Sequence, residues 1–506
     1  MKRMVAAVLA LCVLLCGCGV IRENNRPGAI VSTSVLDMGD NEDTGRVVTP
    51  AVYFLNGSSR TLTAEPRRLI VATGTNPAEV AVEALLEGPT GSSELTAVAP
   101  EGMTLEYIEY SRVVANVYLS YEGTPMDPQT QYILELAIAN TVTDILGAEY
   151  ICIFLNGLQA GFQGAPSAPL KKQSGNVDDA WRSASAKADA SRAIFAAQDE
   201  ALPETSVPEV SAPAQPAATA VELQTVLYYI SADGGYLLPE VHTVEYPPDG
   251  GVQALIAELQ KTPNNAALMK SPISEDVKLL DAALTDGEDG LTLSLNFSRR
   301  VDTNVQQSAL SYAALIYTLT GFIPDVETVQ ISIGGVPLGA VDGVTGLSDG
   351  LQRSDFIGYI GSSAPLYFAD KKSDLLIEVS RSMEQGETWS ARARVLELLK
   401  GPLQGEGTSI WPVMPTGATE ADIISVDVYG DTAYLNLSQH FKDACAGLSA
   451  RSEMLLVYAM VNTVTAMDGV SKVQFLIEGR QTQTLAGTLC LADPFLKNYG
   501  LIKKSG

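Results

Sequence analysis

The sequence contains very little histidine and cysteine. Among 506 residues there are two histidines, His242 and His440, and six cysteines, three of which lie in the first 18 residues. No H-E-x-x-H, G-x-S-x-G or P-loop motif occurs, and no Cys/His cluster has the spacing of metal ligands. The sequence therefore lacks the known signatures of zinc hydrolysis, serine hydrolysis and nucleotide binding. We predict no metal, no cofactor and no enzymatic activity.

The three later cysteines do not form a repeated framework. Cys152 lies in the apolar stretch 151–155 and is expected to be a small buried hydrophobe. Cys445 and Cys490 lie in or after the last repeat described below. The sequence leaves open whether these two form a disulfide, because spacing alone does not give the geometry that a disulfide needs.

Basic residues are also scarce. Lys and Arg number 33 against 59 Asp and Glu, which gives a formal net charge of −26. A negative field of this size argues against nucleic acid and against docking on anionic lipid headgroups. It fits an extracytoplasmic body whose partners are proteins or basic patches, or an acidic solvated surface with no partner at all.

Long apolar runs are absent except at the N-terminus. Lys2-Arg3 precedes the apolar stretch 4–15, which is typical of a secretory signal and too short to span a bilayer. The following Leu15-Cys16-Gly17-Cys18 resembles a lipobox. We expect residues 1–17 to be a signal peptide and Cys18 to carry a lipid such as palmitate, which anchors the chain at the extracytoplasmic face of the cell membrane. The alternative is a plain signal peptide with incidental cysteines.

One pattern occurs three times in the rest of the chain. Each copy has an aromatic strand start, a helix stopped by proline, a strand ending in serine, an xT[VL]T element and an apolar strand ending in glycine. The xT[VL]T elements begin at Asn140, Tyr317 and Asn462, and the closing glycines are Gly157, Gly335 and Gly479. A constant element order with variable gaps indicates one domain fold copied three times.

The periodicity within each copy predicts its fold. Apolar residues around each xT[VL]T element recur at spacings of 4, 4 and 3, which is one face of a helix. An alanine beside this face, Ala137, Ala314 or Ala459, would allow a close approach between helix and sheet. We predict β-hairpin, α, β, β, α, β in each copy. The fold class is α+β, with three repeated α/β-sandwich domains joined by linkers.

The repeats set the predicted domain boundaries. We expect a lipid-anchored tether at 18–47, domains at 48–163, 222–342 and 363–490, linkers at 164–221 and 343–362, and a C-terminal tail at 491–506. The first linker combines an alanine-rich helix, with Trp181 and Phe195 on one face, and a proline-rich spacer. The helix is expected to pack on its own domain. The second linker is short, so the second and third units are expected to pack as a pair.

The recurring polar residues have structural explanations. A threonine on a helix that faces a sheet, such as Thr141, is expected to bond back to the carbonyl of its own turn. Asn and Ser at a strand end favour a turn. No carboxylate recurs at an equivalent position in all three units, so the sequence does not point to paired-carboxylate catalysis.

The pattern resembles the GerMN domain of sporulation and spore-germination lipoproteins. The likeness rests on helix ends such as Leu399-Lys400-Gly401-Pro402, strand ends such as Asn436-Leu437-Ser438 and helix ends such as Asn462-Thr463-Val464-Thr465. It is best in the third unit and weakest in the second, where Thr262 replaces the glycine before Pro263. The chain departs from the family pattern by having three units rather than two.

This resemblance implies a membrane-anchored, non-catalytic protein of endospore-forming bacteria, related in fold to ring-building domains. We therefore expect a scaffold that acts in sporulation or germination through protein partners in an envelope complex, with oligomer formation left open. The alternative is a cell-surface module that binds peptidoglycan or a small ligand. Such a module would need an aromatic-lined cleft.

Overall fold

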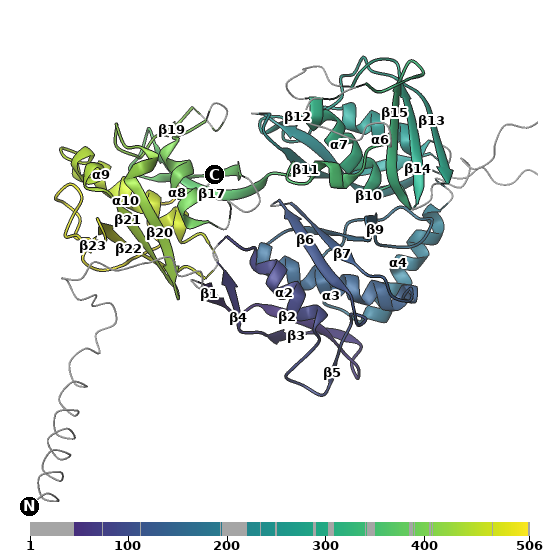
Figure 1. Cartoon of the computed structure of the whole chain (residues 1–506), viewed down its shortest axis with the longest axis horizontal. Coiled ribbons are helices and arrows are strands. Elements are labelled where there is room, and N and C mark those ends of the chain that lie inside the picture. The colour runs from purple at the N-terminus through teal and green to yellow at the C-terminus, as the bar shows by residue number, and fades with distance from the viewer. Residues whose placement is uncertain are drawn as a thin grey trace, which may run out of the picture.

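The structure is a computed structural model of the whole chain. It describes residues 45–72, 74–111, 113–192, 194, 220–232, 234–247, 250–286, 290–301, 308–339, 341, 350–383, 388, 390–403, 406, 408–467 and 469–503. Within these ranges three mixed α/β units follow one another along the chain (Figure 1). The predicted fold class is confirmed.

The three units share one order of elements, to which the third unit adds one helix and one strand among the described residues. The first contains β2 (Ala51–Asn56), β3 (Thr61–Pro66), α2 (Pro77–Leu86), β5 (Leu95–Thr96), β6 (Thr104–Tyr110), β7 (Val114–Ser120), α3 (Pro128–Leu146), β8 (Tyr150–Leu155) and β9 (Leu158–Gln159). The second contains β10 (Val221–Ser231), β11 (Leu237–Tyr246), α6 (Gly251–Gln260), β12 (Met269–Lys270), β13 (Leu279–Asp286), β14 (Leu291–Phe297), α7 (Ser308–Thr320), β15 (Val326–Ile333) and β16 (Val336–Pro337). The third contains β17 (Ser362–Asp370), β18 (Leu376–Met383), α8 (Ala391–Leu399), β19 (Ile410–Trp411), β20 (Ile423–Tyr429), β21 (Thr432–Leu437), α9 (Gln439–Ala444), α10 (Ala450–Val464), β22 (Lys472–Ile477), β23 (Arg480–Gln481) and β24 (Phe495–Leu496).

A few elements lie outside this plan. They are β1 (Gly45–Val48) and β4 (Leu69–Ala72), which pair with each other, the helix α4 (Val177–Ser191), and the short 3₁₀ helices η3 (Arg353–Phe356), η5 (Glu420–Asp422) and η6 (Tyr499–Leu501).

The strands of each unit are divided between two sheets rather than joined in one. In the first unit the hairpin forms the sheet β3-β2-β5, and the later strands form β6-β7-β8-β9. The pair β7–β8 is parallel, and α3 is the crossover between these two strands. The equivalent sheets recur in the other two units, with β24 added to the last.

A threonine joins the helix that carries the xT[VL]T element (α3, α7 or α10), called the second helix below, to the first strand of its unit. Thr141 donates to the carbonyl of Ala137 at 2.9 Å, which confirms the predicted bond to its own turn. The same hydroxyl oxygen also accepts the backbone N–H of Tyr53 at 3.1 Å. The equivalent bonds from tyrosine N–H to threonine in the other units are 3.1 Å and 3.2 Å long and join the pairs Tyr228–Thr318 and Tyr367–Thr463.

The helix–sheet contacts follow the predicted phase. Ala137, Ala314 and Ala459 are fully buried, so a small residue does lie where each second helix meets its unit's core. The first helix of two units ends where the sequence predicts: Gly88 (φ 94°) and Gly401 (φ 75°) adopt the left-handed conformation just before proline. The second unit lacks this glycine, and its chain leaves α6 through an extended Lys261 instead.

Each unit is covered by the segment that follows it. In the first unit Ile151 pairs with Leu170, and the side chain of Asn140 exchanges two hydrogen bonds with the backbone of Gln173, of 2.8 Å and 2.7 Å. The third unit repeats this arrangement, since Asn462 bonds twice to the backbone of Asn498. Residues that the sequence places in the first linker and in the tail thus pack on the unit before them.

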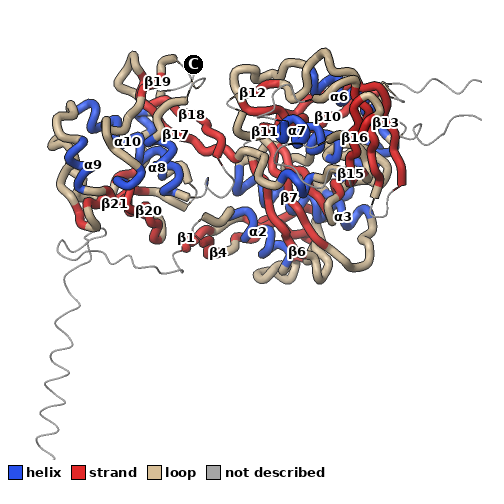
Figure 2. The backbone as a smooth tube through the Cα atoms, turned by 45° about the horizontal axis from the view of Figure 1, so that its top comes forward, coloured by secondary structure: helices blue, strands red, loops and turns tan. Residues whose placement is uncertain are grey.

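The first two units share a hydrophobic core. Side chains on one face of the β6–β9 sheet, including Val114, Tyr118 and Phe154, belong to the same buried cluster as the core of the second unit. The third unit has separate clusters. Figures 1 and 2 show its main body apart from the first two, which lie side by side, although β1 contacts β20 of the third unit. The predicted pairing of the second and third units is wrong. The apolar linker residues Leu351, Phe356 and Ile360 are buried in the cluster of the first two units, and a short linker does not require the domains that it joins to pack on each other.

Candidate functional site

Cys18, the predicted lipidation site, lies outside the described residues, as does Phe195. The described cysteines are free: Cys152 and Cys445 are buried and Cys490 is exposed. Burial raises the pKa of the Cys152 thiol to about 12, which fits its predicted role as a small hydrophobe. Among the described residues no cluster of His, Cys, Asp and Glu could hold a metal ion, and no helix could cross a membrane.

His440 and Ser438 meet Asp422, a combination of residue types found in hydrolases. The geometry is that of a helix cap. Ser438 donates to the Asp422 carboxylate at 2.5 Å and accepts the N–H of Phe441 at the start of α9, and His440 Nδ1 lies 3.0 Å from the same carboxylate. Although burial acts to raise it, the hydrogen bonds from Ser438 and its neighbours lower the pKa of Asp422 to about 2. Ser438 bonds the carboxylate rather than the imidazole, so the histidine does not lie between the two as it does in a Ser-His-Asp triad.

A polar cluster lies at the end of the first helix in every unit. In the first unit Arg67 bonds Glu65 and the carbonyl of Gly88, and Glu65 accepts the N–H of Gly91 at 2.9 Å. Although burial acts to raise it, the hydrogen bonds from Gly91 and Thr90 lower the pKa of Glu65 to about 2. In the third unit Arg381 forms a bidentate pair with Glu406, at 2.7 Å and 2.6 Å.

The second unit places His242 where the other two have arginine. Its Nε2 lies 2.6 Å from Glu240 and its Nδ1 lies 3.2 Å from Glu258. Strand registers show that Glu240 is equivalent to Glu65. The sequence pattern does not reveal this recurrence, because no single carboxylate is common to all three units. The hydrogen bonds of the cluster hold the loop after the first helix against the hairpin, so the role of the cluster is structural.

A buried polar network joins the first and second units. Glu109, which is 2% exposed, accepts hydrogen bonds of 2.7 Å from the hydroxyls of Tyr118 and Tyr317. Arg353 donates to the Tyr118 hydroxyl at 3.1 Å and to the Tyr317 carbonyl at 2.8 Å. Its guanidinium lies 4.0 Å from the ring centre of Phe154. Burial raises the pKa of Glu109, and the tyrosine hydroxyls and Arg353 oppose that rise.

Sequence analysis did not predict this network, although a signal was present. Strand registers align Tyr118 with Asn296 and Asn436, whose side chains accept N–H groups of Gly335 and Gly479. Tyr317 likewise replaces the asparagine found in the other two xT[VL]T elements. Two residues of the junction, Tyr118 and Tyr317, thus lie at positions where the other repeats have asparagine.

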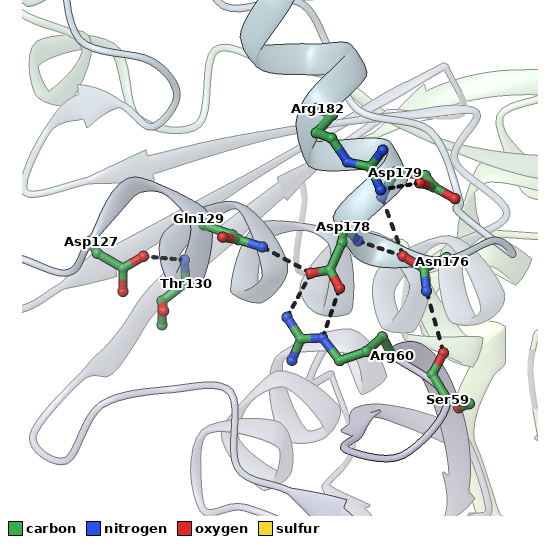
Figure 3. A network of polar contacts seen from close by, with 9 residues as sticks. All are labelled: Ser59, Arg60, Asp127, Gln129, Thr130, Asn176, Asp178, Asp179 and Arg182. Carbon is green, nitrogen blue, oxygen red and sulfur yellow. Dashed lines mark hydrogen bonds and ion pairs between the residues drawn. The ribbon is translucent and has the colours of Figure 1, made fainter.

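The helix α4 is anchored on the first unit by a second polar network (Figure 3). Arg60, in the β2–β3 turn, forms a bidentate pair with Asp178, at 3.0 Å and 2.7 Å. Gln129 donates to the same carboxylate at 2.8 Å, and Asn176 caps the helix. The bonds from Arg60 lower the pKa of Asp178. This helix packs on its own domain, as the sequence predicts, and the ring of Trp181 stacks on that of Phe162 with centres 5.0 Å apart.

A cavity of about 380 Å³ lies between α3, α4 and the segment that covers the first unit. We call it the α3–α4 cavity. Residues that line it include Tyr132, Glu135, Gln159, Phe162 and Ala184, with Leu223 and Gln224 of the second unit at one side. Two of its lining residues, Tyr132 and Phe162, are aromatic, as the alternative of a binding module would require.

The comparisons with known proteins agree with the repeat. The family model described as "Germane: Sporulation and spore germination" matches residues 51–160, 226–339 and 365–483, which is more than half of the chain. The chain belongs to the Germane family. The Germane family is not a known enzyme family, and membership of it supports a role in sporulation or spore germination.

Solved structures of related domains are also similar to this chain. The tandem GerMN domains of the sporulation protein GerM from Bacillus subtilis are 18% identical, with 57% of this chain and 92% of that chain covered and a TM-score of 0.21. The first GerMN domain of the same protein is 22% identical, covering 26% and 99%, with a TM-score of 0.21. A candidate lipoprotein from Clostridium perfringens is 24% identical, covering 27% and 87%, with a TM-score of 0.19. No curated protein matches the chain.

Proposed function

We propose that this Germane protein is a lipid-anchored, extracytoplasmic, non-catalytic scaffold that acts in sporulation or spore germination by binding other proteins. The observation that carries the proposal is the junction between the first two units. There a buried glutamate, a buried arginine and two tyrosines bond to one another across domains. These groups join two copies of the domain through buried bonds, which supports a structural role for the pair.

The anchor is part of the proposal and rests on the sequence. Lys2-Arg3, the apolar stretch that follows and Leu15-Cys16-Gly17-Cys18 fit a lipidated signal, with palmitate or a similar acyl chain on Cys18. One acyl chain gives only weak binding to a bilayer, so stable anchoring takes a second chain or a protein contact. The net charge of −26 supports protein partners rather than nucleic acid.

Deletion of the gene tests the role directly. We expect impaired spore formation or germination with normal vegetative growth, and we expect the lipidated protein to crosslink to envelope proteins of the sporulating cell. Complementation with the Cys18→Ser variant should leave the protein out of the membrane fraction and fail to restore sporulation.

Two results would count against the proposal. Full complementation by Cys18→Ser would show that anchoring is not needed. Tight binding of muropeptides by the purified protein, without any protein partner, would favour the alternative of a peptidoglycan-binding module.

A further inference from the structure

Two side chains that line the α3–α4 cavity, Glu135 and Gln159, have hydrogen-bond acceptors with few donors. Glu135 of α3 is 4% exposed and lines the cavity, and among the described residues its carboxylate accepts one hydrogen bond, of 2.9 Å, from Gln131. Gln159 also lines the cavity, and its buried Oε1 has no partner there. A buried acceptor without a donor, such as Gln159 Oε1, is unfavourable, and the Glu135 carboxylate can accept further hydrogen bonds. Together they favour an occupant that carries N–H groups.

The aromatic part of the lining favours a positively charged group on a narrow aliphatic chain. The rings of Tyr132 and Phe162 both line the cavity, with centres 5.7 Å apart, and Trp181 stacks behind Phe162. Aromatic rings attract ammonium groups when water is excluded. The volume, about 380 Å³, lies in the range of small-molecule sites.

We propose that the α3–α4 cavity binds a primary ammonium group on a short aliphatic chain, with Glu135 as the counter-ion and Gln159 as a second acceptor. Such a group occurs on free alkylamines and on the side chains of diamino acids in peptides. The proposal does not depend on the scaffold role, because a scaffold with an empty cavity and a scaffold with a filled one are equally able to bind proteins.

The protonation state of Glu135 makes amine binding depend on pH. Burial raises the pKa of Glu135 to about 7, so its carboxylate fraction grows between pH 6 and pH 8. The other titratable side chains that line the cavity are Tyr132, Cys152, Lys171 and Lys187. The pKa values of the first three are all raised, which keeps them from titrating in that range. Lys171 is already paired with Glu149 at 2.9 Å.

Calorimetry on the purified full chain tests the proposal with three probes. n-Pentylamine represents a free amine, Nα-acetyl-lysine amide represents a peptide side chain, and 1-pentanol is the neutral control. We expect one or both amines to bind at pH 8 at least tenfold more tightly than pentanol, and to bind roughly tenfold more weakly at pH 6. Which amine binds better identifies the source.

Variants connect any binding to the cavity. Glu135→Gln keeps the shape of the side chain and should weaken amine binding at pH 8 by tenfold or more and remove its pH dependence. Ala184→Trp should block the cavity without touching either acceptor. The exposed Glu94→Gln is the matched control and should bind as the wild type does. The proposal is overturned by absence of amine binding at millimolar concentration, by equal binding of pentanol, or by amine binding that survives both cavity variants.

Discussion

The hydroxyl of Tyr317 in the second unit lies 2.7 Å from the carboxylate of Glu109 in the first, and both side chains are buried. The same hydroxyl lies 3.2 Å from the carbonyl of Phe356, in the segment that covers the second unit. One residue therefore holds its own unit's covering segment and binds the neighbouring unit. In the other two units an asparagine performs only the first of these tasks.

Arg353→Met should destabilise the junction between the first two units. The arginine is 5% exposed, and its removal leaves Glu109 and Tyr118 buried without a cation, so we expect a loss of roughly 3 kcal/mol of unfolding free energy. Urea denaturation followed by tryptophan fluorescence measures it. Arg392→Met is the control, because that arginine is paired at 3.5 Å with the exposed Glu420 and should matter little. Equal losses in the two variants would show that the network contributes nothing to the junction.

Thr463→Val should destabilise the third unit. The substitution keeps the shape of the side chain but leaves the buried N–H of Tyr367 without its acceptor, which costs about 1–3 kcal/mol. Thr465→Val is a matched control two residues later, since its hydroxyl bonds only the carbonyl of Val461 in its own helix. Thermal unfolding of both variants compares them. An equal loss of stability in Thr465→Val would mean that the unbonded N–H of Tyr367 is not the cause of the destabilisation.

Ala459→Leu should also destabilise the third unit. Ala459 is fully buried against Tyr367 and Leu455, so extra methylene groups would overpack the contact at a cost of roughly 1–3 kcal/mol. Ala450→Leu places the same side chain at the exposed start of the same helix and should be nearly neutral. Chemical denaturation distinguishes the two. No effect at Ala459 would contradict the helix packing described above.

Glu135 should make stability fall as pH rises. Its pKa is raised to about 7 in the folded chain from the ordinary 4.5, so the folded state holds the proton more tightly than the unfolded state does. The contribution of Glu135 to the free energy of unfolding is complete below pH 4.5 and is lost as pH rises to about 7. The change is on the order of 3 kcal/mol at most. Glu135→Gln should remove this slope from unfolding curves recorded between pH 5 and pH 8, and Glu94→Gln should leave it. An unchanged slope in Glu135→Gln would show that the carboxyl is solvated.

The features of the fold that depend on local sequence pattern could be predicted from the sequence alone. The order of elements in each unit, the proline stops and the buried alanines follow from periodicity and turn chemistry, and these appear in the structure at the expected residues. The junction depends instead on which faces meet after folding. Tyr118, Tyr317 and Arg353 come from three distant stretches, and nothing in local pattern brings them together. The division of each unit's strands into two sheets was missed for the same reason, because periodicity identifies strands but does not pair them.

The covering segments determine how such a domain can be copied. The family matches end at residues 160, 339 and 483, but the first and third units are closed by backbone groups of Gln173 and Asn498, more than ten residues later. A gene duplication that ended at the match would produce a domain with Asn140 or Asn462 buried and unbonded. A complete copy of the domain therefore includes the segment that covers it as well as the residues that match the family.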